Sequence, residues 1–129
     1  MDIKEYFENT QGSGILATAD SEGKVDAAIY ARPHFMDDGT IALIMRDRLT
    51  HHNLQSNPHA AYLFIEDGKG FKGIRLFLTK VREEKDSDLL FELRKRTNLE
   101  KVPIDNDPMY LVFFNIDKEL PLIGPGEDI

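Results

Sequence analysis

The sequence predicts a mainly β fold: an antiparallel barrel of about six strands with short flanking helices. Three observations indicate this fold. Short runs rich in β-branched, aromatic and aliphatic residues recur along the chain, and tight-turn signals separate them. Few segments have the spacing of an amphipathic helix. The length of 129 residues suits one core, so we expect a single domain over residues 1–129.

The first half of the chain is expected to form one helix and three strands. Asp2 to Asn9 can form a short capped helix whose apolar face plugs one end of the core. The turn signals Asp20–Gly23 and Asp37–Gly39 then separate three apolar runs, which predicts antiparallel pairing. These strands are expected over Gly14–Ala19, Val25–Phe35 and Thr40–Met45.

The second half adds two helices and three strands. Thr50 is a candidate N-cap for a short polar helix from His51 to Ser56, which Asn57-Pro58 ends. Ser87 is expected to cap a helix that runs to Arg96. The strands are expected over Ala60–Ile65, Gly73–Val81 and Met109–Ile116. The segment Leu120–Gly124 either extends the last strand or pairs separately.

Composition excludes several function classes. The chain has no cysteine, which excludes disulfides, thiol catalysis and thiolate-bound metals. A net charge of −7 argues against general nucleic-acid binding, which needs a clustered basic surface. No apolar run is long enough to span a bilayer, and the N-terminus is acidic where a signal peptide would be basic. We therefore expect a cytoplasmic protein that binds neither nucleic acid nor membrane.

Some motifs suggest chemistry that their context does not support. Gly68 to Gly73 matches a dinucleotide-binding pattern, but a strand follows where that pattern needs a helix, so we interpret it as a hairpin loop. The adjacent His51 and His52 point apart on a helix, and we expect neither a shared metal nor a carboxylate partner at helical spacing. The acidic segment Glu83 to Asp86 is interpreted as a solvated strand end or helix start without catalytic function.

The segment Met45–Leu54 is more informative, because a strand that ends in arginines leads directly into a helix N-terminus. Unpaired N–H groups and guanidinium groups together favour an anion such as phosphate. Arg32, Arg46 and Arg48 are expected on two neighbouring strand ends. The alternative is that these arginines are ordinary surface residues paired with Asp47.

The order of these elements resembles the pyridoxamine 5'-phosphate oxidase-like split-barrel family, which binds FMN. The resemblance covers nearly the whole chain and depends on Gly14–Asp20, the Asp38-Gly39 turn and, above all, Asn53–Pro58 before a strand. It implies a homodimer with FMN at the subunit interface. The cofactor-binding positions that it implies are Ala28, Ile29, Tyr30, Ala31, Arg32, Ile44, Met45, Arg46, Arg48, Leu49, Thr50 and His51.

The sequence also departs from the family pattern. Thr50 stands where many members have a lysine, and Ala28 replaces a basic residue, so we expect the three arginines to supply the positive charge while Thr50 and His51 donate hydrogen bonds. The chain lacks tryptophan and the C-terminal segment with which true oxidases grip pyridoxal phosphate, so that activity is not expected.

The leading hypothesis is an FMN-dependent oxidoreductase or electron-transfer protein with an unidentified small-molecule or redox partner. Bound FMN supplies the electron chemistry, so no catalytic side chain needs to be visible in the sequence. The alternatives are a flavin-binding or flavin-sensing module without turnover, and a flavin-free interaction domain. A haem-handling role would need a histidine near the barrel mouth, and the sequence does not rank the four histidines for it.

Overall fold

The computed structural model describes residues 2–96 and 107–124, which form three helices and seven strands. The helices are α1 (Ile3–Asn9), α2 (Leu49–Ser56) and α3 (Asp88–Arg96). The strands are β1 (Gly12–Ala19), β2 (Val25–Tyr30), β3 (His34–Phe35), β4 (Ile41–Arg46), β5 (His59–Glu66), β6 (Gly73–Lys85) and β7 (Met109–Pro121). Among the described residues, no helix has the length and apolar character needed to cross a membrane.

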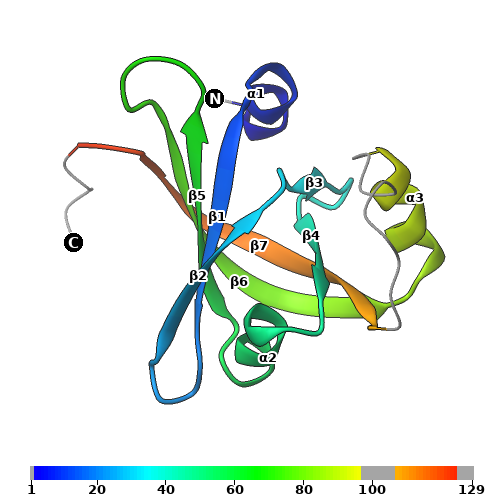
Figure 1. The fold of residues 1–129 in the computed structure, drawn as a ribbon. Helices are drawn as coiled ribbons and strands as arrows, with labels where there is room; N and C mark the ends of the chain where they lie inside the picture. The colour runs from blue at the N-terminus through cyan, green and yellow to red at the C-terminus, as the bar shows by residue number, and fades with distance from the viewer. Residues whose placement is uncertain (1, 97–106, 125–129) are drawn as a thin grey trace.

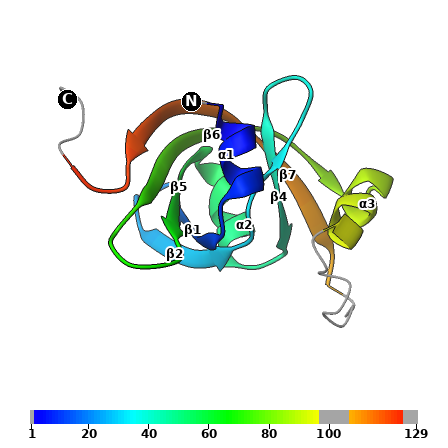
Figure 2. The ribbon, with the colours of Figure 1, turned by 90° about the horizontal axis from the view of Figure 1, so that it is seen from above.

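One antiparallel sheet contains all seven strands in the order β2-β1-β5-β6-β7-β4-β3. The sheet curls into a half-barrel, as Figure 2 shows from above. The predicted mainly β, antiparallel barrel with short helices is therefore confirmed. The expected pairing of Val25–Phe35 with Thr40–Met45 holds only at His34–Phe35, which pairs with β4, whereas β2 and β4 lie near opposite edges of the sheet.

The seventh strand arises from a break in the expected strand Val25–Phe35. The chain leaves β2 after Tyr30 and resumes as β3 only at His34. Pro33 lies in this gap and is buried. Because proline has no N–H group for the ladder, and because it restricts the residue before it, one continuous strand cannot form here. β2 then pairs with β1, whereas β3 pairs with β4.

Helices α1 and α2 lie at opposite ends of the half-barrel (Figure 1). α1 begins after Asp2, whose side chain accepts a hydrogen bond from the Glu5 N–H, and it buries Ile3 and Phe7, as predicted. Arg32 donates to the carbonyls of Phe7 and Thr10 at the other end of α1, at 2.9 and 3.0 Å. These bonds satisfy carbonyl groups that have no partner within the helix.

The prediction for α2 needs two corrections. The N-cap is Arg48 rather than Thr50, because the helix starts two residues earlier than expected. The helix is also not a polar surface element, since it packs against β1, β2 and β4. Its polar residue Asn53 is buried and donates to the Thr18 hydroxyl at 3.1 Å. The other buried side chains of α2 are Thr50, His51 and Leu54.

Strands β6 and β7 are longer than predicted and pair along nearly their whole length. β6 continues past Val81 to Lys85, and β7 continues past Ile116 to Pro121, so residues 120 and 121 extend the last strand. Register shifts occur beside Phe77 and between Lys80 and Arg82. Such bulges bend a strand and allow a long ribbon to follow the curve of a barrel.

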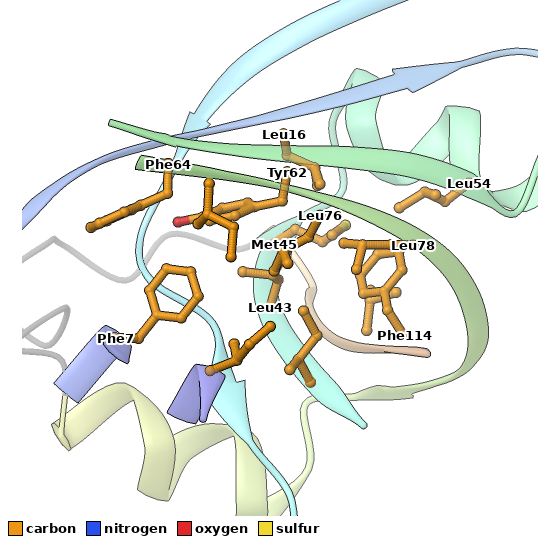
Figure 3. Close-up of a cluster of buried hydrophobic side chains, with 14 residues drawn as sticks. Phe7, Leu16, Leu43, Met45, Leu54, Tyr62, Phe64, Leu76, Leu78 and Phe114 are labelled. Atoms are coloured by element: carbon orange, nitrogen blue, oxygen red, sulfur yellow. The ribbon is translucent and has the colours of Figure 1, made fainter. Parts of the chain in front are cut away.

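Two hydrophobic cores lie on opposite faces of the sheet. The main core fills the half-barrel, where aromatic rings from α1 and β5 meet aliphatic side chains from β4 and β6 (Figure 3). The second core lies between α3 and strands β4 and β7, and it includes Leu90, Leu93, Leu111 and Phe113. The Ser87 hydroxyl accepts from the Leu90 N–H at 3.1 Å, which confirms the predicted cap of α3.

The outer surface of β2, β1, β5 and β6 is largely apolar, and its β2 side chains are exposed. Directly paired residues of antiparallel strands lie on the same face. One row across the four strands is entirely apolar and ends at Phe77, and the next row is apolar up to Leu63 and ends at Arg75 on β6. We call this surface the apolar outer face. It consists of Ile15, Ala17, Ala19, Val25, Ala27, Ile29, Ala61, Leu63, Ile65 and Phe77. Val25 and Ile29 are 84% and 83% exposed.

Candidate functional site

The end of β2 meets the start of α2, where the side chain of Thr50 lies beside that of Tyr30. Thr50 is buried, and burial raises the pKa of the Tyr30 hydroxyl. The sheet curls far enough to bring these two elements together, although β2 and β4 are not neighbours in it. Two of the predicted cofactor positions, distant in sequence, are therefore in contact.

The three predicted phosphate-binding arginines have different surroundings in the structure. Arg48 forms an exposed ion pair with Asp107 at the start of α2. Arg32 donates to the C-terminal carbonyls of α1, beside a cavity of about 560 Å³ that α1, the β2–β3 connection and α3 surround. Arg46 is half-buried at the end of β4. Thus Arg46 and Arg48 flank the same helix start, whereas Arg32 stabilises the opposite end of the barrel.

The remaining predicted positions divide between the two faces of the sheet. Ile29 belongs to the apolar outer face, while Met45 is buried in the main core and Ile44 packs against the second core. Leu49 is 55% exposed in the first turn of α2. Ala28 is half-buried on β2, and Ala31 is exposed just after it. Met45 therefore acts in packing, whereas Ile29 and Leu49 present apolar surface to the outside.

His51 is buried and lies at the centre of a polar cluster whose other side chains are partly exposed. Its Nδ1 lies 3.2 Å from the Asp47 carboxylate, and its Nε2 lies 3.0 Å from that of Glu83 on β6. The ring stacks on Tyr110 of β7 with centroids 3.7 Å apart. Gln55, one turn further along α2, donates to Glu83 at 3.0 Å. The cluster therefore ties α2 to the two long strands of the sheet.

Glu83 is the most strongly perturbed acid of this cluster. Burial raises its pKa, but hydrogen bonds from Lys80, Gln55 and His51 outweigh burial and bring the pKa from 4.5 down to about 2. The Lys80 ammonium lies 2.6 Å from the carboxylate. A carboxylate with these partners stays ionised in moderately acidic solution and holds the helix in place.

Sequence reasoning missed this cluster. The expectation that His51 has no carboxylate at helical spacing is wrong, since Asp47 lies four residues before it. Glu83 does lie near a strand end, since β6 ends at Lys85, but the expectation that it is solvated is wrong, because its side chain is 23% exposed and hydrogen-bonded to His51. The spacing Asp47, His51, Gln55 repeats every four residues and is the one signal in the sequence that points to this helix face.

The chain is similar in structure to several solved proteins at low sequence identity. An FMN-binding protein from Syntrophomonas wolfei subsp. wolfei is 19% identical, with a TM-score of 0.68 over 92% of this chain and 82% of that one. The haem storage protein HutZ from Vibrio cholerae is also 19% identical, with a TM-score of 0.70 over 92% of this chain and 91% of that one. A candidate pyridoxamine 5'-phosphate oxidase from Listeria innocua is 16% identical, with a TM-score of 0.63 over 93% of this chain and 94% of that one.

The fold is that of the pyridoxamine 5'-phosphate oxidase-like split barrel. The expected fold resemblance is thus confirmed, with seven strands in place of six. No protein-family model and no curated protein matches the sequence. At these sequence identities, the similarity shows the split-barrel fold alone. The ligand of this chain must be inferred from its own residues.

Proposed function

We propose that this protein is an FMN-binding flavoprotein that acts as a homodimer in oxidoreduction or electron transfer. The observation that carries the proposal is the contact between Tyr30 and Thr50, which joins the end of β2 to the start of α2. It creates one surface where a helix N-terminus, the side chain of Arg48 and the nearby Arg46 can act on a single anion. The phosphate of FMN is such an anion.

The residues at this surface fit the phosphate. Arg48 is 60% exposed at its side chain, so it can exchange the carboxylate of Asp107 for a phosphate. The first-turn N–H groups of α2 have no partner within the helix. Both ring nitrogens of His51 face carboxylates in this structure, so we assign it to positioning the helix rather than to touching the phosphate.

The apolar outer face supports the homodimer. An uncovered apolar sheet surface of this extent marks an interaction site on a soluble protein. A second copy of the chain, related by a twofold axis, covers such a self-complementary surface in both subunits at once. A flavin ring needs apolar walls on both sides, and one half-barrel offers one of them, so we place the FMN at the subunit boundary. We also propose that the protein is located in the cytoplasm.

The flavin, when bound, supplies the electron chemistry, and the chain binds, orients and shields it. One relative in structure favours a second candidate function, since HutZ is described as a haem storage protein. We therefore keep haem binding as the alternative, with the exposed His59 at the margin of the apolar outer face as its candidate ligand.

The first test is an absorbance spectrum of the purified protein before and after it is incubated with FMN and passed through a gel-filtration column. Retained visible flavin bands at dimer mass support the proposal. An intense Soret band after incubation with haemin, with no retention of FMN, favours the alternative. Retention of neither ligand refutes both and leaves an interaction domain.

The second test is the variant Arg48→Ala, with Lys24→Ala in the exposed β1–β2 turn as the matched control. Loss of one charge-assisted hydrogen bond to phosphate is expected to weaken FMN binding about tenfold or more. Fluorescence quenching of FMN measures the affinity. Equal affinities of the Arg48 variant and the control would remove Arg48 from the phosphate site.

A further inference from the structure

A second cavity lies at the end of the barrel opposite α2. Its volume is about 510 Å³, and it is formed by α1, the loop between β5 and β6, and the C-terminal end of β7. Figure 1 shows these three elements on one side of the molecule, away from α2 and from the β1–β2 hairpin. None of the residues that line this cavity belongs to the proposed flavin site.

The rim of this cavity is apolar and unusually exposed. Phe71 in the β5–β6 loop is 76% exposed, and Ile123 after β7 is 62% exposed. Ile74 and Leu120 line the same cavity and are buried. Phe71 and Ile123 both line the hollow, and large exposed apolar side chains there lose water contact when a ligand enters, which favours binding.

The polar groups of the cavity are mainly acidic. The Tyr6 hydroxyl donates to one carboxylate oxygen of Glu66 at 2.6 Å. Burial and this carboxylate raise the pKa of Tyr6, so the hydroxyl remains the donor and orients Glu66. Among the described residues, the other oxygen of Glu66 receives no hydrogen bond. Glu119 and Lys72 are the other charged residues of the lining, which gives two carboxylates against one ammonium.

We propose that this cavity binds a small hydrophobic amine, a molecule with an aromatic or aliphatic body and a primary ammonium group. The ammonium group donates to the open oxygen of Glu66, and the apolar body lies between Phe71 and Ile123. The net charge of −7 on the chain also attracts a cation over an anion. This site is separate from the flavin surface and does not need flavin for binding.

The test uses two probes of similar shape and opposite charge, phenethylamine and 3-phenylpropionate. Each is titrated into the full-length protein, with and without FMN, and binding is followed by two-dimensional amide NMR spectra. We expect saturable shifts with the amine at Phe71, Gly73 and Leu122, and the same amine affinity with and without FMN. Saturation by the acid at equal or lower concentration would overturn the proposal, as would the absence of saturable shifts with the amine.

Variants of the cavity residues then test which side chains bind the amine. Glu66→Gln keeps an acceptor for the Tyr6 hydroxyl and removes the charge, and it should weaken amine binding about tenfold. Phe71→Ser should weaken it through loss of apolar contact, and because Phe71 is exposed its loss should not unfold the protein. Glu22→Gln, in the exposed turn at the far end of β1, is the control and should bind as the wild type does. Unchanged affinity in both cavity variants would refute the site whatever the FMN result.

Discussion

The variant Glu83→Gln tests whether the polar cluster around His51 holds α2 against the sheet. The wild-type carboxylate accepts hydrogen bonds from Lys80 at 2.6 Å, from Gln55 at 3.0 Å and from His51 at 3.0 Å. Glutamine has nearly the same shape, but it has no charge and turns an N–H₂ group toward some of these donors. We expect the variant to fold and to be less stable near neutral pH.

The size of the loss follows from the pKa of Glu83. A fall from 4.5 to about 2 corresponds to about 3 kcal/mol of stability near neutral pH. The side chain is 23% exposed, and solvent screening reduces this to about 2 kcal/mol. Because the folded-state pKa is the lower one, the contribution is complete above pH 4.5 and is lost as the pH falls toward 2.

The assay is urea denaturation of wild type and variant between pH 7 and pH 3. The difference in unfolding free energy should be about 2 kcal/mol at pH 7 and should shrink below pH 4.5, as worked out for the pKa of Glu83. Glu84→Gln is the matched control, since Glu84 forms an exposed ion pair with Arg82 worth about 0.5 kcal/mol. A difference that does not change with pH, or that is no larger than the control, would refute the reasoning.

Three further variants test other parts of the structure. Ile29→Asp on the apolar outer face should convert a dimer to a folded monomer by gel filtration; a dimer of unchanged mass would move the interface elsewhere. Tyr30→Phe should cost about 1 kcal/mol in denaturation through loss of the hydroxyl group beside Thr50 and should weaken FMN binding, and full FMN affinity would argue against that contact as the core of the site. Gly14→Ala should cost about 2–3 kcal/mol, because a Cβ there would lie 1.9 Å from the Tyr62 hydroxyl; unchanged stability would mean that this side chain moves freely.

The parts of the fold that depend on local chemistry were predictable from the sequence. Asp2 and Ser87 cap their helices as expected, because a side-chain acceptor beside free N–H groups acts within a few residues. The β1–β2 hairpin follows from the turn at Asp20–Gly23. Strand patterns alone do not distinguish a split barrel from other antiparallel barrels. The resemblance to a known family made that distinction.

The parts that depend on tertiary context were not predictable. α2 looked polar because hydropathy does not show that its polar side chains have buried partners, as Asn53 has in Thr18. Glu83 looked solvated because acidic side chains at strand ends usually face water, whereas the fold places donors from α2 and Lys80 against its carboxylate. Of the candidate cofactor positions, the sequence could not show that Tyr30 and Thr50 would touch, since the curl of the whole sheet brings them together.

Strand β7 contributes to both hydrophobic cores. Val112 and Phe114 point into the half-barrel, while Leu111 and Phe113 point toward α3. Amide hydrogen exchange should therefore be slowest in the middle of β7, and α3 should exchange faster, because it can detach from the sheet without opening the barrel. Unfolding that separates β7 from its neighbouring strands would disrupt both cores at once, whereas loss of α3 would expose the second core alone.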